Sequence, residues 1–271
     1  MIASLKSKAK HTVKNFFYRK NRYIFRTTDE SSLIEFFTKV QPVTTNHKLI
    51  RIGGDADGGY LVPDDLNGIK ACFSPGVADT ASFESDMIAR GIKCYLADYS
   101  VEGAPVENEL VEFEKKYLGP SENEIYMTLE NWVSRKCPND SDMILQMDVE
   151  GAEYGVIFDT SGETLKKFRI IVVEFHKLDS LIQKAGFELI DLTFTKLLKY
   201  FDIVHIHPNN VHEIRAYKGY EIPPIIEVTF LRKDRISNKE CTKSFPHPLD
   251  VKNNLSRYDI HLPECWYQPK K

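Results

Sequence analysis

The feature that most constrains the fold is an alternation of short apolar runs with amphipathic helical patterns, which begins near residue 48. Because each apolar run is bounded by turn residues, this alternation is typical of βαβ units and a mostly parallel sheet. We expect strands at Lys70–Phe73, Lys93–Ala97, Glu124–Met127, Met143–Met147, Ile170–Phe175, Ile203–Ile206 and Ile225–Leu231.

The intervening segments predict helices, at Ala81–Arg90, Glu107–Tyr117, Glu153–Phe158, Asp179–Ala185 and Thr195–Lys199. The expected fold class is therefore α/β, with a doubly wound, mostly parallel sheet of seven strands. Before it, the glycine-rich segment 51–62 predicts a hairpin. We divide the chain into a basic helical extension (1–47), a main domain (48–237) and an irregular C-terminal tail that wraps the domain (238–271).

Charge is distributed unevenly along the chain. Residues 1–26 contain eight Lys or Arg and no acidic residue, so the formal net charge of -3 leaves about -11 on the remainder. A body this acidic is a poor nucleic-acid binder, and we expect no nucleic-acid partner.

The basic segment itself has apolar residues at helical spacing, namely Ile2, Leu5, Ala9, Val13 and Phe16. Three interpretations stay open. It could be a solvated helix packed on the domain or on a second subunit, an amphipathic helix on an anionic membrane, or a mitochondrial transit peptide.

The cysteines and the hydropathy pattern bear on the compartment. The five cysteines are far apart and form no C-x-x-C pair, which favours a reducing compartment over a disulfide framework or a zinc cluster. No stretch approaches the roughly 20 apolar residues needed to cross a bilayer, and no secretory signal is seen. We expect a cytoplasmic protein, with peripheral contact at the inner face of the membrane through residues 1–26 as an alternative.

Two strand ends carry residues suited to a nucleotide-like ligand. Ligands of doubly wound sheets bind beyond the carboxyl ends of the strands. Gly76 follows the first strand directly, where it permits a tight turn before a helix, and Asp98 ends the second strand, where a carboxylate can accept ribose hydroxyls. The turn lacks G-x-G-x-x-G, which disfavours a nicotinamide-dependent enzyme.

The fourth strand runs into the acidic block Met147-Asp148-Val149-Glu150-Gly151-Ala152-Glu153. Three carboxylates at a strand end are unfavourable unless a metal, a cation or a proton transfer uses them. Glu150 and Glu153 could instead begin the next helix, whose positive end attracts acids. For Asp148 we favour a functional role.

Histidines end the next two strands. His176 follows Glu174 after the fifth strand, and His207 closes the sixth, with His205 on the same face. An imidazole suits a general base that removes a hydroxyl proton. Asp148 with His176 and His207 is also a plausible metal-binding set.

Together these residues resemble the FkbM family of class I S-adenosylmethionine-dependent methyltransferases over roughly residues 48–232. The matching segments are Asp57–Tyr60, Phe73–Gly76, Asp98, Thr128–Leu129, the 147–153 block, His176 and His207–Asn210, with weaker likenesses at Pro248–Asp250 and Cys265–Trp266. The sequence departs from the family at Ser74–Ala78, where class I enzymes usually have a more glycine-rich loop.

The resemblance implies a Rossmann-like fold and S-adenosylmethionine as cofactor, with a divalent metal as a further option. The Gly76 turn would contact the amino-acid part of the cofactor, Asp98 the ribose and residues 124–129 the adenine. The cofactor-binding residues so implied are Tyr60, Ser74, Gly76, Asp79, Phe83, Asp98, Thr128, Asp148 and Glu150. The catalytic residues are Asp148, His176 and His207, which would also hold a metal.

The function expected from this resemblance is O-methylation of a hydroxyl on a carbohydrate or glycan, such as an O-antigen or capsule, in glycan biosynthesis. One alternative is a metal-assisted O-methyltransferase that acts on a small natural product. Another is a non-catalytic cofactor-binding or scaffold module recruited through its basic N-terminus.

Overall fold

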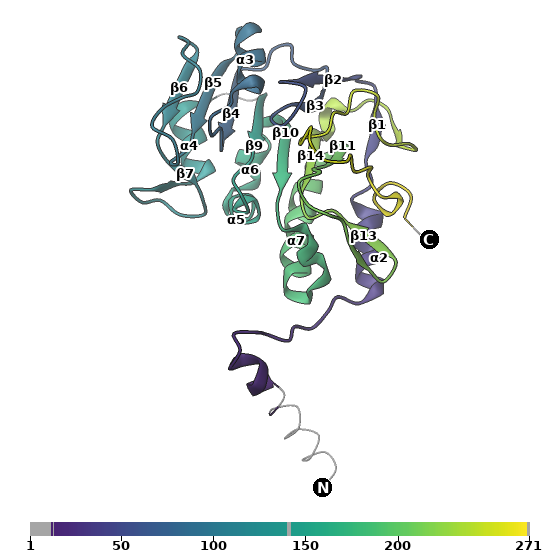
Figure 1. Cartoon of the computed structure of the whole chain (residues 1–271). Helices are drawn as coiled ribbons and strands as arrows, with labels where there is room; N and C mark the ends of the chain where they lie inside the picture. The colour runs from purple at the N-terminus through teal and green to yellow at the C-terminus, as the bar shows by residue number, and fades with distance from the viewer. Residues whose placement is uncertain (1–11, 13, 140–141, 270–271) are drawn as a thin grey trace.

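The computed structural model describes residues 12, 14–139 and 142–269, and a seven-stranded sheet forms its centre (Figure 1). The strand order is β11-β14-β10-β9-β4-β5-β6. All neighbouring pairs are parallel except those made by β14, which runs antiparallel to both β10 and β11. The expected Rossmann-like α/β sheet is confirmed. Its strands are β4 (Ala71–Pro75), β5 (Lys93–Ala97), β6 (Val111–Glu114), β9 (Met143–Met147), β10 (Phe168–Phe175), β11 (Phe201–Pro208) and β14 (Ile226–Arg232).

A strand prediction and a helix prediction that concern the same edge of the sheet were wrong. The strand expected at 124–127 is only the short β8 (Tyr126–Met127), which pairs with β7 (Tyr117–Leu118) outside the main sheet. The helix expected at 107–117 instead contains β6, which pairs with β5. Apolar and acidic residues alternate along β6 with a period of two, which suits a half-buried edge strand.

Besides the helical residues 14–18, the described helices are α2 (Glu30–Lys39), α3 (Ser82–Ala89), α4 (Leu129–Lys136), α5 (Glu153–Asp159), α6 (Gly162–Leu165) and α7 (Lys184–Leu198). The predictions for α3 and α5 are confirmed. The two short helices expected at 179–185 and 195–199 are a 3₁₀ turn, η1 (Leu178–Ile182), followed by the single helix α7. We did not predict α4, although Thr128 caps its N-terminus by accepting from Asn131 N–H and basic residues occupy its last turn.

Two apolar layers cover the faces of the sheet. On one face, Phe73 and Val173 pack with residues of α2, α4, α5 and α7, such as Trp132. On the other face, Cys72 and Val172 pack with α3 and with the hairpin of β2 (Leu49–Ile52) and β3 (Tyr60–Pro63). The hairpin predicted from the glycine-rich segment is thus confirmed, and it lies over the face that carries the site.

Residues 14–25 project away from the sheet (Figure 1). Of the expected amphipathic positions, Ile2, Leu5, Ala9 and Val13 lie outside the described residues, and Phe16 is exposed. The chain joins the body at Arg26, whose carbonyl accepts from Lys184 N–H over 2.8 Å. Next, Thr27 forms a bridge with Gln183, and Thr28 Oγ1 donates to Leu181 O over 2.6 Å. Among the described residues, none of the helices has the length and apolar character that crossing a membrane requires.

The last part of the chain is largely irregular, as expected, and folds back on the body. A second hairpin, formed by β12 (Arg215–Tyr217) and β13 (Tyr220–Ile222), precedes β14. The 3₁₀ turn η2 (Lys233–Arg235) follows β14. In the tail, β15 (Lys239–Cys241) pairs with β1 (Val43–Thr45), and the 3₁₀ turn η3 (Glu264–Trp266) buries Trp266 against α2.

Candidate active site

A cavity of about 630 Å³ opens at the carboxyl ends of β4, β5 and β9. The chain leaves β4 toward β5 on one side and returns to β9 on the other, so this is the topological switch point at which doubly wound sheets bind ligands. The volume suits a small organic ligand. Six of the nine predicted cofactor residues line the cavity, namely Tyr60, Gly76, Phe83, Asp98, Asp148 and Glu150.

Gly76 is required by the geometry at this point. Its φ is +87°, and a Cβ added there would lie 1.5 Å from the carbonyl oxygen of Asp148. The Gly76 N–H donates to Ala97 O over 2.8 Å, and Asp148 N–H donates to Pro75 O over 3.2 Å. The ends of the three strands are thereby held against one another, and a side chain at position 76 would separate them.

Asp98 links the loops that follow β4 and β5. Its Oδ2 accepts from Ala78 N–H at 2.9 Å, and its Oδ1 accepts from the backbone and hydroxyl of Ser100 at 2.8 and 2.7 Å. The carboxylate is 5% exposed and borders the cavity. Its orientation is therefore fixed before any ligand arrives.

The three remaining predicted cofactor residues do not line the cavity. Ser74 is buried beneath it, where its hydroxyl bonds with Glu84 and Gln146, two residues of the cavity wall. Asp79 is exposed to solvent, and Thr128 is the N-cap of α4. Any effect of Ser74 on a ligand would act through the two side chains it supports.

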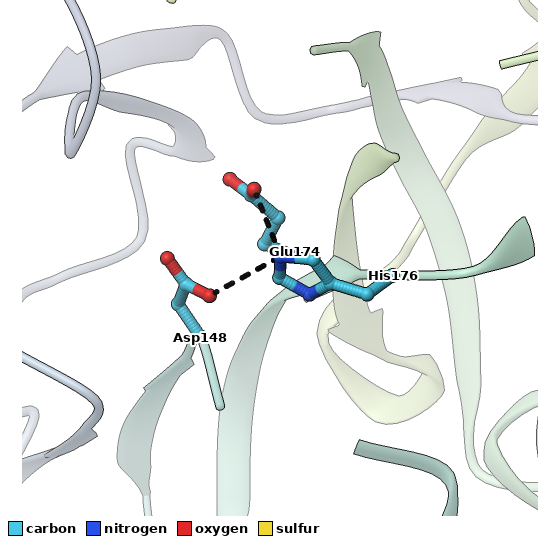
Figure 2. Close-up of side chains that lie close together, drawn as sticks. All are labelled: Asp148, Glu174 and His176. Carbon is cyan, nitrogen blue, oxygen red and sulfur yellow. Dashed lines mark ion pairs between the residues drawn. The ribbon is translucent and has the colours of Figure 1, made fainter. Parts of the chain in front are cut away.

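His176, just after β10, lies among four carboxylates. Its Nδ1 lies 3.0 Å from Glu153 Oε1, and its Nε2 lies 3.4 Å from Glu150, 3.6 Å from Glu174 and 3.9 Å from Asp148. Figure 2 shows Asp148 and Glu174 approaching this Nε2 from neighbouring strands. The structure therefore brings together the predicted pair Asp148 and His176, and adds Glu174.

Glu153 fixes the state of the imidazole. The side chain is completely buried, and its Oε1 also accepts from Gly151 N–H at 2.9 Å and from Val149 N–H at 3.3 Å. An acceptor at Nδ1 holds the ring proton on that nitrogen, which leaves Nε2 as the basic atom facing Asp148. Glu153 thus both opens α5 and contacts the imidazole of His176.

Burial and charge act in opposite directions on this pair. Burial alone would lower the pKa of His176, but the hydrogen bond with Glu153 and the surrounding carboxylates raise that pKa above its ordinary value. Burial, together with Glu150 and Glu153, raises the pKa of Asp148 to about 7 against the attraction of His176. The carboxyl group of Asp148 can therefore change protonation near neutral pH.

A second polar row continues from Glu174 across the sheet. Glu174 on β10 faces Glu227 on β14, which faces His207 on β11. Burial raises the pKa of Glu227 to about 7, and burial with neighbouring carboxylates raises the pKa of Glu174 well above its usual range. We did not predict Glu227 as a site residue, because β14 is antiparallel and its first residues, not its last, lie at the edge that carries the site. The sequence signal that could have identified Glu227 is a single acidic residue within an otherwise apolar strand.

His207 belongs to this row and contacts the tail. Its Nδ1 lies 3.6 Å from Asp250 Oδ1, and the same oxygen lies 2.8 Å from His205 Nε2. Burial lowers the pKa of His207, but Asp250 raises it above the ordinary value overall. Of the three predicted metal ligands, Asp148 and His176 form a compact group with Glu174, whereas His207 pairs with Asp250.

Residues 127–222 match the methyltransferase FkbM domain. The matched segment runs from β8 to β13 and so includes Asp148, Glu153, Glu174, His176 and His207. No curated protein matches the chain.

Proposed function

Since the chain carries a methyltransferase FkbM domain, we propose that it is an S-adenosylmethionine-dependent O-methyltransferase that acts on a hydroxyl of a carbohydrate or glycan. The observation that carries the proposal is the position of His176. Its basic Nε2 stands at the end of β10, beside Asp148, which borders the cavity at the switch point. A base next to a cofactor-sized cavity is the arrangement that hydroxyl methylation needs.

The cavity fits the proposed cofactor in two respects. Gly76 lets the ends of β4 and β9 lie close together at the cavity wall, and Asp98 is preset to accept ribose hydroxyls. Asp148 Oδ1 is buried and has no hydrogen-bond partner among the described residues. A carboxylate oxygen left in this state suits the positive charge of a sulfonium.

Bound in this cavity, S-adenosylmethionine would supply an electrophilic methyl group, with its sulfur as the leaving group. His176 Nε2 would accept the proton of the acceptor hydroxyl. Glu153 keeps the other ring nitrogen protonated, so that the imidazolium formed is stabilised by a buried carboxylate. The Asp148 carboxylate would stabilise the positive charge of the sulfonium before the methyl group is transferred.

A carbohydrate acceptor is supported by the polar groups beyond His176. Glu174, Glu227 and Asn253 are buried on the same side of the sheet, and Asp57 approaches them from the hairpin. Several carboxylate and amide groups close together can donate to and accept from the hydroxyls of a sugar.

The test separates cofactor binding from turnover. Asp98→Asn removes one charged acceptor, and we expect the Kd for S-adenosylmethionine, measured by calorimetry, to rise roughly 10- to 100-fold. Glu102→Gln, an exposed carboxylate in the same loop, is the matched control and should leave the Kd unchanged.

His176→Ala should retain wild-type cofactor affinity and lose at least about 100-fold in kcat on a glycan found by screening with methyl-labelled cofactor. Wild-type turnover in His176→Ala would remove this residue from the mechanism. Cofactor binding without transfer to any glycan would favour the scaffold interpretation instead.

A further inference from the structure

Three neighbouring strands present a row of titratable side chains on one face of the sheet. Glu174 and Glu227 are directly opposed between β10 and β14, and Glu227 and His207 are directly opposed between β14 and β11. Opposed like charges destabilise a strand pair unless something between them compensates. A positively charged occupant would compensate this row.

Two segments far away in the sequence add oxygen atoms to this row. Asp57, in the turn of the hairpin, offers a carboxylate oxygen within 4.8 Å of oxygens of both Glu174 and Glu227. Asn253, in the tail, donates to Asp57 Oδ1 over 3.2 Å and also to Glu227. The amide thus holds two of the three carboxylates in place.

Two buried polar atoms of this group lack a partner. Glu174 Oε2 and Asn253 Oδ1 make no hydrogen bond within the part of the chain that the structure describes. These two residues are only 4–5% exposed. Leaving such groups unsatisfied is unfavourable, and a bound ion is one of the few occupants that would satisfy oxygens from three segments at once.

The basic side chains of the described residues meet only the flanks of this group. His176 Nε2 lies 3.6 Å from Glu174, and His207 attracts Glu227 electrostatically. Among residues 14–139 and 142–269, no Lys or Arg forms an ion pair with Asp57, Glu174 or Glu227. Arg51 attracts Glu227 electrostatically, but its guanidinium donates to the carbonyls of Gly54 and Ala56.

We propose that a hard divalent cation of the Mg²⁺ or Mn²⁺ type binds between Asp57, Glu174 and Glu227. Carboxylate oxygens are the ligands such ions prefer, and an all-oxygen set disfavours zinc. This site is distinct from the Asp148–Glu174–His176 group, with which it shares Glu174. Its role, which rests on the proposed function, is to bind an oxygen of the acceptor beside His176.

The test measures Mn²⁺ binding directly, by electron paramagnetic resonance titration of the full chain after chelator treatment. The wild type should bind Mn²⁺ saturably. Glu227→Gln and Asp57→Asn should each weaken binding at least tenfold, since each removes one anionic ligand. Glu240→Gln, which neutralises an exposed carboxylate on β15, is the matched control and should bind as the wild type does.

His176→Ala distinguishes the two groups that share Glu174, because it removes a ligand only from the other group. Retained Mn²⁺ affinity in His176→Ala supports the site proposed here. Loss of affinity in His176→Ala but not in Asp57→Asn would overturn it, as would an absence of saturable binding to the wild type or equal affinity in Glu227→Gln.

S-adenosylmethionine titrations without metal, on the same preparations, verify that the variants are folded and keep the two proposals separable. Cofactor binding without Mn²⁺ binding would remove the cation site and leave the proposed function standing. If Mn²⁺ binds with the expected variant pattern but S-adenosylmethionine does not bind, the cation site stands and the proposed function fails.

Discussion

At the scale of single residues, Glu153 determines what His176 can do. It has no exposed surface, it accepts from two backbone N–H groups, and it pairs with Nδ1 of the imidazole. A buried carboxylate in this position raises the affinity of the ring for a proton at Nε2. The strength of the proposed base is therefore set by a residue that need not touch the acceptor.

Glu153→Gln should show this effect in the pH profile. Glu153 raises the pKa of His176, so its removal should lower that pKa and move the acidic limb of the kcat profile to lower pH. The weaker base should also reduce the plateau kcat roughly tenfold. The measurement is kcat from pH 5 to pH 9, with Glu163→Gln on the exposed surface of α6 as control. An unshifted acidic limb with a reduced plateau would mean that Glu153 is only structural.

Sequence reasoning located those site residues that follow parallel strands. Gly76, Asp98, Asp148 and His176 all stand where a strand ends, and the edge rule for doubly wound sheets brings such positions together. The same rule passes over Glu227, because β14 runs the other way. Asn253 could not be found at all, since nothing local in an irregular tail tells which strand it will approach.

At the scale of elements, an aromatic cluster joins the two ends of the chain. Trp266 of η3 lies edge-on to Phe36 and Phe37 of α2, with ring centroids 6.2 and 5.0 Å apart, and Phe37 stacks on Tyr220 of β13. All four rings are buried. The expected boundaries of the main domain, at residues 48 and 237, remain predictions. The packing shows that α2 and the tail share one core with the sheet.

Trp266→Ala should destabilise the protein by about 3–5 kcal/mol, because it leaves a cavity among these rings. Urea unfolding followed by circular dichroism measures the change. Tyr258→Ala is the control, because this aromatic ring of the same tail is 97% exposed and its removal should change the free energy of unfolding by less than about 0.5 kcal/mol. Equal stabilities for the two variants would show that the tail does not contribute to the core.

At the scale of the whole molecule, basic side chains and exposed apolar side chains occur together in the segment before Thr27. Residues 14–26 include five basic side chains, and Phe16, Tyr18, Tyr23, Ile24 and Phe25 are 42–70% exposed. Among the described residues, the first backbone hydrogen bond with the body is made by Arg26, whose carbonyl accepts from Lys184 N–H over 2.8 Å. Exposed aromatic and basic side chains in one segment suit the interface of an anionic membrane.

Deletion of residues 1–26 tests the predicted membrane contact. The full chain should sediment with phosphatidylserine-containing vesicles at low salt and be released at 0.5 M salt, since the attraction is screened. The truncated chain, whose net charge falls from -3 to about -11, should stay in solution with an unchanged melting temperature. Equal sedimentation of both chains would assign any lipid binding to the body.

The hairpin and the tail have a consequence for how such an enzyme could diversify. Asp57 and Asn253 reach the polar row from outside residues 127–222, the segment that matches the FkbM domain. On the proposed assignment, the groups that meet the acceptor are thus partly encoded apart from those that perform the transfer. Substitutions in the hairpin and in the tail could therefore change the acceptor, by selection or by engineering, without any change in strands β9 and β10.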